Sequence, residues 1–119
     1  MTDVLAVRAT GRYVQMSAQK MRLVADLIRG RQANEAMEIL RFTPNAAARP
    51  IAKILRSAIA NAEENFGLSR DELFVDRVFA NEGPTRRWRR FGARGRFKPL
   101  LRRSSHVTVI LREREQTAG

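Results

Sequence analysis

Residues 82–106 limit what this chain can fold into more than any other segment does. They contain nine basic residues and one acidic residue, so they carry a net charge of +8 out of the +11 of the whole 119-residue chain. Such a segment does not form a packed core, because burying unpaired guanidinium groups costs too much free energy. It needs a dense anionic partner, and the backbone of a nucleic acid is the commonest one.

The other 94 residues are sufficient for one small globular body, and the hydrophobic content of 44 % predicts that this body folds. We expect a single domain over 1–119. Its body comprises 1–81 and 107–113, its basic hairpin spans 82–106, and its tail at 114–119 frays.

Several kinds of structure are not expected from composition and sequence pattern. The chain has no cysteine, so it has neither disulfides nor thiolate metal sites, which fits an intracellular protein. No apolar run approaches the ~20 residues that cross a bilayer. The N-terminal residues lack the charged and apolar pattern of a signal peptide.

The first helix is predicted from a cap and an apolar stripe. Ser17 is a favoured N-cap residue, and apolar residues recur at helical spacing behind it. The helix is therefore predicted over about 18–29, with Gly30 ending it. Leu23 and Leu27 are expected to widen the buried stripe.

Two further helices follow. The first of them is predicted over about 35–42, with Asn34 as its cap. A longer one is predicted to begin between 46 and 50 and to run to about Phe66, where Gly67 stops it. Pro50 is tolerated in its first turn, because the amide hydrogens there have no partner in the helix.

Three stretches predict strands. Residues 4–9 alternate weakly and reach Gly11, and residues 106–111 have high β propensity. Residues 73–80 have a period of two, and strict alternation places four of them on one face: Leu73, Val75, Arg77 and Phe79.

The last two strands flank the basic segment, which predicts a hairpin with a very long connection. Its arms are expected to continue the strand ladder outward, since roughly 11 residues per arm at ~3.4 Å each span on the order of 35 Å. Gly92 and Gly95 mark the predicted tip, where positive φ angles are needed. Pro99 is expected to interrupt the returning arm.

The sequence offers no convincing catalytic or metal site. His106 is the single histidine and lies beside Ser104 and Ser105. A Ser–His pair is one interpretation, but a strand-edge histidine that bonds locally or contacts a phosphate is favoured, because neighbours in sequence do not make a triad. The carboxylates show no metal-ligand spacing, and the nucleotide-binding fingerprints are absent. We expect no enzyme activity, catalytic residue, cofactor or metal.

The basic segment has the chemistry of an RNA ligand. Guanidinium groups bind phosphates in pairs of hydrogen bonds and stack on bases. Trp88, Phe91 and Phe97 are interleaved with them, so stacking on unpaired bases is available. The alternative is that each aromatic ring covers the arginine beside it. A second, weaker basic set surrounds the first helix, and a solvated face is its alternative: Arg12, Lys20, Arg22 and Arg29.

Four motifs resemble one family, the large-subunit ribosomal proteins numbered twenty-two, a universal family, in its bacterial type. Residues 17–30, SAQKMRLVADLIRG, resemble its first-helix motif, and residues 57–65, SAIANAEEN, resemble its long-helix motif. Residues 82–84, EGP, and 102–109, RRSSHVTV, resemble the two bases of its extended hairpin. The matches are collinear and cover nearly the whole chain.

The resemblance implies an α+β fold, with three helices packed on a small three-stranded antiparallel sheet and a long protruding β-hairpin. It implies a body on the outer face of the large ribosomal subunit near the peptide exit. The hairpin threads into large-subunit ribosomal RNA, and its tip lines the nascent-peptide tunnel. The implied partners are this RNA, neighbouring large-subunit proteins and the nascent polypeptide, in the cytoplasm, with no membrane, cofactor or small-molecule substrate.

The tip departs from the family pattern. Bacterial members usually read Met-Pro-Arg-Ala near it and Gly-Arg-Ala shortly after, whereas here the methionine and proline are missing and Phe97 replaces a small residue. The residues expected at the tunnel wall are Arg90, Phe91, Gly92 and Ala93. Charge and the resemblance together predict these RNA-binding residues: Arg86, Arg87, Trp88, Arg89, Arg90, Arg94, Gly95, Arg96, Lys98, Arg102, Arg103, Ser105, His106, Lys20 and Arg22.

Two other functions remain open at the level of sequence. An architectural DNA-binding protein also uses a basic β-arm, and Phe91 would then be the apolar wedge at its tip. An RNA-acting enzyme that depends on His106 is the third class.

Overall fold

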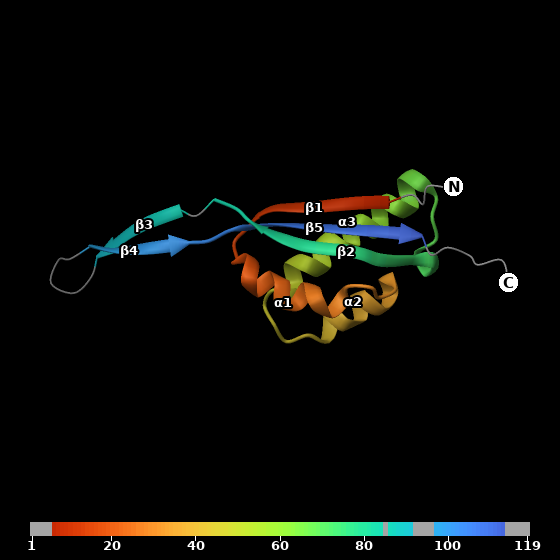
Figure 1. Ribbon diagram of the computed structural model, residues 1–119, viewed down its shortest axis with the longest axis horizontal. Helices are drawn as coiled ribbons and strands as arrows, with labels where there is room; N and C mark the ends of the chain where they lie inside the picture. Colours follow the sequence, from red (N-terminus) through yellow and green to blue (C-terminus); the bar gives the residue numbers. More distant parts are fainter. Residues whose placement is uncertain (1–5, 85, 92–96, 114–119) are drawn as a thin grey trace.

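The computed structural model describes residues 6–84, 86–91 and 97–113, which form a three-stranded sheet, three helices and a separate two-stranded arm (Figure 1). The antiparallel sheet has the order β1 (Ala6–Val14), β5 (Ser105–Glu113), β2 (Leu73–Glu82). The predicted α+β class is confirmed. Strand β5 is central, and it pairs with both neighbours along most of its length.

Helices α1 (Ala18–Ile28) and α3 (Ala48–Phe66) begin and end where local signals predict. The Ser17 hydroxyl oxygen accepts a hydrogen bond from the Lys20 amide at 3.4 Å, which confirms the cap. Gly30 and Gly67 have φ angles of 81° and 63°, the left-handed conformation that ends a helix most easily at glycine. Pro50 lies in the first turn of α3, as predicted.

Helix α2 (Ala33–Phe42) begins two residues earlier than predicted, and its cap is Gln32 and not Asn34. The Gln32 side-chain oxygen accepts hydrogen bonds from the amides of Asn34 at 2.9 Å and Glu35 at 3.3 Å. The Asn34 side chain instead donates to the Asp71 carboxylate at 3.0 Å. The prediction failed because glutamine is rarely a cap, and here its longer side chain folds back over the first turn.

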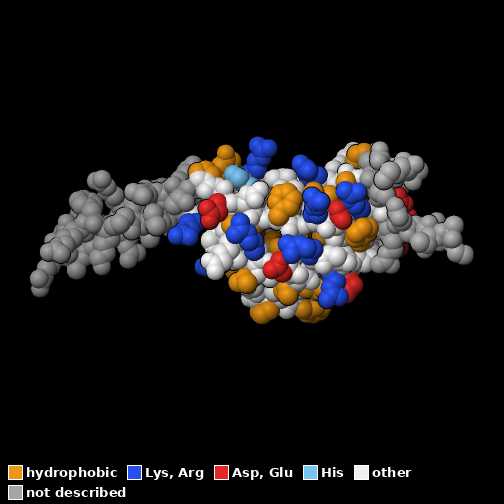
Figure 2. Space-filling model, viewed as in Figure 1, with side chains coloured by type: hydrophobic (Ala, Val, Ile, Leu, Met, Phe, Trp, Pro, Cys, Tyr) orange, Lys and Arg blue, Asp and Glu red, His pale blue; other side chains and the backbone are white. Residues whose placement is uncertain are grey.

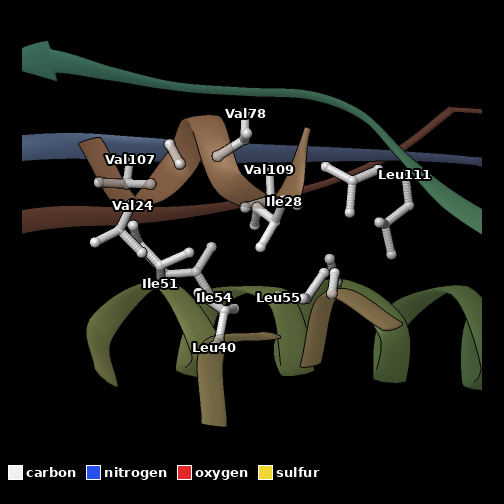
Figure 3. Packing of buried hydrophobic residues seen from close by; sticks show 14 of the residues in the cluster. Val24, Ile28, Leu40, Ile51, Ile54, Leu55, Val78, Val107, Val109 and Leu111 are labelled. Carbon is white, nitrogen blue, oxygen red and sulfur yellow. The ribbon is translucent and has the colours of Figure 1, made fainter. Parts of the chain in front are cut away.

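The core lies between the sheet and the helices (Figure 3). It is built from aliphatic residues of all three helices and the three body strands, among them Val24, Ile28, Leu40, Ile51, Leu55, Val78, Val107, Val109 and Leu111. Leu23 and Leu27, which were expected to widen this stripe, are 62 % and 46 % exposed. Each precedes a buried residue by one position, which turns it about 100° away from the core.

Strand β2 contains a bulge that reverses the predicted faces. Its register with β5 shifts between Val75 and Arg77, so Asp76 is an extra residue. Leu73 and Val75 are buried before the bulge, and Val78 and Ala80 are buried after it. The expectation that Arg77 and Phe79 share a face with Val75 was therefore wrong, because one inserted residue changes the phase of all that follow.

Strand β1 continues past the predicted range of 4–9 and past Gly11, and it reaches Val14. A Cβ atom at Gly11 would lie 2.5 Å from Ile54 Cδ1 of α3, so this glycine allows a close approach and does not break the strand. The β1–β5 register shifts between Gly11 and Val14. The predicted start of this strand, residues 4 and 5, lies outside the described residues.

The arm projects from one end of the body (Figure 1) and consists of β3 (Arg86–Phe91) and β4 (Phe97–Arg102). It forms its own sheet, so the expectation of one continuous ladder was wrong. The last bond of the body side joins the Gly83 amide to the Ser104 carbonyl at 2.9 Å, and Pro84, which has no amide hydrogen, follows directly.

Pro99 lies within β4, opposite Arg89. The expectation that it interrupts the returning arm was therefore wrong. Both strands of a two-stranded sheet are edge strands, where proline is tolerated. The predicted tip glycines, Gly92 and Gly95, and the predicted frayed tail at 114–119 lie outside the described residues.

Two arginines of the first helical region cover the free edge of β2. The Arg22 Nε donates to the Ala80 carbonyl at 3.1 Å, and an Arg29 terminal nitrogen donates to the Val78 carbonyl at 2.8 Å. These bonds satisfy carbonyl groups that an open sheet edge leaves unpaired.

A matched pair of leucines tests the packing. Leu55→Ala empties a fully buried position on α3, and we expect it to lower the free energy of unfolding by about 2–5 kcal/mol. Leu23→Ala is the control because its side chain is largely exposed, and it should change stability by less than ~0.5 kcal/mol. Urea unfolding followed by circular dichroism measures both. Equal losses in the two variants would contradict the observed burial of α1.

Candidate nucleic-acid interface

The arm concentrates positive charge in two short paired strands. Strands β3 and β4 together contain six basic residues and no acidic residue among twelve. Their register places Arg86 opposite Arg102 and Arg90 opposite Lys98. Like charges at directly opposed positions destabilise an antiparallel pair, so this arm favours an anion that neutralises them.

Several of the residues predicted to contact RNA or the tunnel lie in the two strands of the arm. Arg86, Arg87, Trp88, Arg89, Arg90 and Phe91 lie in β3, and Lys98 and Arg102 lie in β4. The predicted tip and its neighbours, Gly92, Ala93, Arg94, Gly95 and Arg96, lie outside the described residues.

A hollow of about 710 Å³ lies at the junction of body and arm, and two predicted RNA-binding residues line it. Lys20 is in the first turn of α1, and Arg103 follows β4, 83 positions later in the chain. The other lining residues come from the turn between β1 and α1 and from the loop before α3: Gln15, Met16, Ser17, Asn45 and Ala46. The hollow can bind a phosphate, because two cations and several hydroxyl and amide donors line it. None of its lining residues is a carboxylate that would repel the anion.

Two other residues that were predicted to bind RNA, Arg22 and Ser105, are less accessible to it. The Arg22 Nε is already bonded to the Ala80 carbonyl, although its side chain lies at the surface. Ser105 is fully buried, and in the described part of the chain its hydroxyl has no hydrogen-bond partner. Because its side chain is buried, Ser105 is not in a position to contact RNA.

His106 is bonded to β1 and not to a serine. Its Nδ1 accepts a hydrogen bond from the Tyr13 amide at 3.1 Å, and the two rings meet edge to face, with centroids 4.9 Å apart at 86°. The Ser104 hydroxyl donates to the Pro84 carbonyl at 2.8 Å. Among the described residues, neither adjacent serine bonds to His106, so the geometry of a Ser–His nucleophile is not formed there.

Tyr13 belongs to this junction, although sequence reasoning did not select it. It is the one non-glycine residue in the described ranges with a positive φ angle, 56°, which costs a bulky side chain roughly 1–2 kcal/mol. Its side chain is 63 % exposed. One sequence signal could have identified Tyr13: it is an aromatic residue directly after Gly11 and Arg12, where the strand alternation stops.

On the face drawn in Figure 2, Lys and Arg side chains are more numerous than Asp and Glu. Arg8 and Arg77 are exposed at positions that flank Ile110 on the central strand, and neither has an ion-pair partner within the described ranges. At the end remote from the arm, interaction with the Glu72 carboxyl group raises the pKa of Glu113.

Other kinds of site find no support in the part of the chain that the structure describes. There, no three histidine or carboxylate side chains are grouped as metal ligands. None of the helices described has both the length and the apolar character needed to cross a membrane.

Comparison with known proteins agrees with the resemblance of the helix and hairpin motifs. The family described as ribosomal protein L22p/L17e matches residues 9–112. The large ribosomal subunit protein uL22 of Pediococcus pentosaceus is 46 % identical over 114 residues, which cover 96 % of this chain and 97 % of that protein. The chain therefore belongs to the ribosomal protein L22p/L17e family.

Proposed function

We propose that this protein is a structural constituent of the large ribosomal subunit that binds large-subunit ribosomal RNA and has no catalytic role. Its family and the name of its Pediococcus relative, a large ribosomal subunit protein, support this proposal. Its partners are then this RNA and neighbouring large-subunit proteins on the cytoplasmic ribosome. The architectural DNA-binding alternative has no observation in its favour beyond the basic arm itself.

The register of the arm is the observation that carries the proposal. Two pairs of basic residues stand opposite each other in β3 and β4, and no carboxylate in either strand balances them. Ribosomal RNA supplies phosphates on both sides of such an arm, which turns the repulsion into attraction. A dense polyanion is therefore the partner that stabilises both the complex and the arm.

We further propose that the tip of the arm lines the nascent-peptide tunnel, with Arg90, Phe91, Gly92 and Ala93 facing the nascent polypeptide. The family resemblance of the hairpin bases supports this position. The arm projects far enough to separate the tip from the body, because six-residue strands at ~3.4 Å per residue extend roughly 20 Å.

We propose that the hollow between Lys20 and Arg103 holds a backbone phosphate at the foot of the arm. Its two cations come from elements that the fold brings together, and its neutral lining residues add hydrogen-bond donors. Such a contact positions the RNA against the foot of the arm without reading the RNA sequence.

The first test is association with the subunit. Tagged protein in a lysate should sediment with large subunits, and replacing the four arginines of β3 by alanine should release it while the body keeps its thermal unfolding midpoint. Sedimentation of the wild-type protein away from large subunits, or preferential binding to duplex DNA that the arm bends, would overturn the proposed function.

The second test locates the tip. The chain has no cysteine, so Gly92→Cys gives one attachment point for an iron chelate that cleaves nearby RNA. We expect cleavage of RNA segments that line the tunnel. A chelate at Glu64→Cys, on the exposed side of α3, is the matched control and should cleave elsewhere. Identical cleavage patterns from the two positions would exclude a tunnel position for the tip.

The third test counts the phosphates that the protein neutralises. If six basic residues meet phosphates, affinity for ribosomal RNA should fall roughly 10³-fold between 50 and 200 mM salt. Lys20→Ala/Arg103→Ala should lower the slope of log affinity against log salt by about 1 for each phosphate that is no longer neutralised. Filter binding at several salt concentrations measures both quantities.

Lys53→Ala/Arg56→Ala is the control for that double variant. It removes one lysine and one arginine from the exposed side of α3, away from the hollow. Its slope should stay close to that of the wild type. Equal slopes in both double variants would show that the hollow binds no phosphate, while RNA binding by the arm would still stand.

A further inference from the structure

Tyr13 is held in an unfavourable backbone conformation at the foot of the arm. Its φ angle of 56° falls where the β1–β5 register shifts, between Gly11 and Val14. Outliers of this kind persist only where surrounding contacts fix them, and they cluster at binding sites. The conformation also keeps a large aromatic side chain 63 % exposed, next to a sheet whose apolar residues are otherwise mostly buried.

One neighbour fixes both the backbone and the ring of Tyr13. His106 of the central strand accepts the Tyr13 amide hydrogen bond through Nδ1 at 3.1 Å. The same imidazole meets the phenol ring at 4.9 Å and 86°. Because His106 is itself anchored in β5, the exposed ring has little freedom to lose when a partner binds it.

The surroundings of Tyr13 favour RNA over a protein partner. Arg12 precedes it and is exposed, and Ser105, which pairs with Val14, is two residues from the exposed Arg103. The cores of protein interfaces are depleted in charge, whereas an aromatic ring among cations matches a nucleotide, with its flat base and its phosphate.

We propose that Tyr13, buttressed by His106, is a base-stacking residue that receives one unpaired base of the ribosomal RNA at the foot of the arm. The inference rests on the proposed function, because it assigns a further interaction to the same RNA. It differs in chemistry from the phosphate contacts of the arm, since stacking is apolar and insensitive to salt.

Affinity and its salt dependence test this assignment. With a transcribed bacterial large-subunit ribosomal RNA as the probe, Tyr13→Leu should bind about tenfold more weakly than the wild type. Tyr13→Phe keeps the ring and should bind within about threefold of the wild type. The slope of log affinity against log salt should be unchanged in Tyr13→Leu, because the same phosphates are still neutralised.

Two controls separate stacking from folding. Asparagine tolerates the left-handed backbone, so Tyr13→Asn should fold with a thermal midpoint close to the wild type and still bind more weakly, as Tyr13→Leu does. Phe66→Leu changes another half-exposed aromatic residue, at the end of α3 remote from the arm, and should leave affinity unchanged.

A direct interaction is tested by ultraviolet irradiation of the wild-type complex, followed by mass spectrometry of the cross-linked peptide. We expect a nucleotide attached at Tyr13. Wild-type affinity in Tyr13→Leu, or equal decreases in Tyr13→Leu and Phe66→Leu, would overturn the stacking assignment while the proposed function stood. Failure of the wild-type protein to bind the RNA would overturn the proposed function itself.

Discussion

The pairing of β5 with β1 on one side and β2 on the other holds the rest of the structure in place. The register reaches Ser105 from both sides, opposite Val14 and opposite Glu82, which is where the chain leaves for the arm. The helices pack on the inward residues of these same strands. The direction of a charged arm is thus fixed by an apolar core that contains none of its charges.

The body and the arm depend on different forces. The body buries aliphatic side chains from three helices and three strands, and this burial stabilises it without a partner. The arm has two strands with basic residues at opposed positions. A two-stranded hairpin is at best marginally stable in water, so the arm gains its stability from the anion that it binds. An anion that neutralises the opposed basic residues therefore also stabilises the pairing of β3 with β4.

Local sequence signals predicted the helices and strands, whereas contacts between distant parts of the chain determine where β2 bulges. Ser17 acts through its own side chain, and Gly30 and Gly67 act through their own backbone. Local sequence therefore predicted both ends of α1 and the end of α3 correctly. The bulge at Asp76 has no such signal. The turn after α1 bonds to both backbone groups of Val75, at 2.8 Å each, and this pairing across 44 or more positions is invisible in the alternation of β2.

The same distinction applies to the candidate site. The arm could be identified from the sequence alone, because the excess of basic residues in 82–106 is visible without a structure. The hollow between Lys20 and Arg103, and the bond from Tyr13 to His106, join residues more than 80 positions apart. Sequence rules fail where β1 loses its register and Tyr13 takes a strained φ angle, and this is the place where the arm joins the body. A strained backbone that persists at such a junction is a reason to assign Tyr13 a binding role.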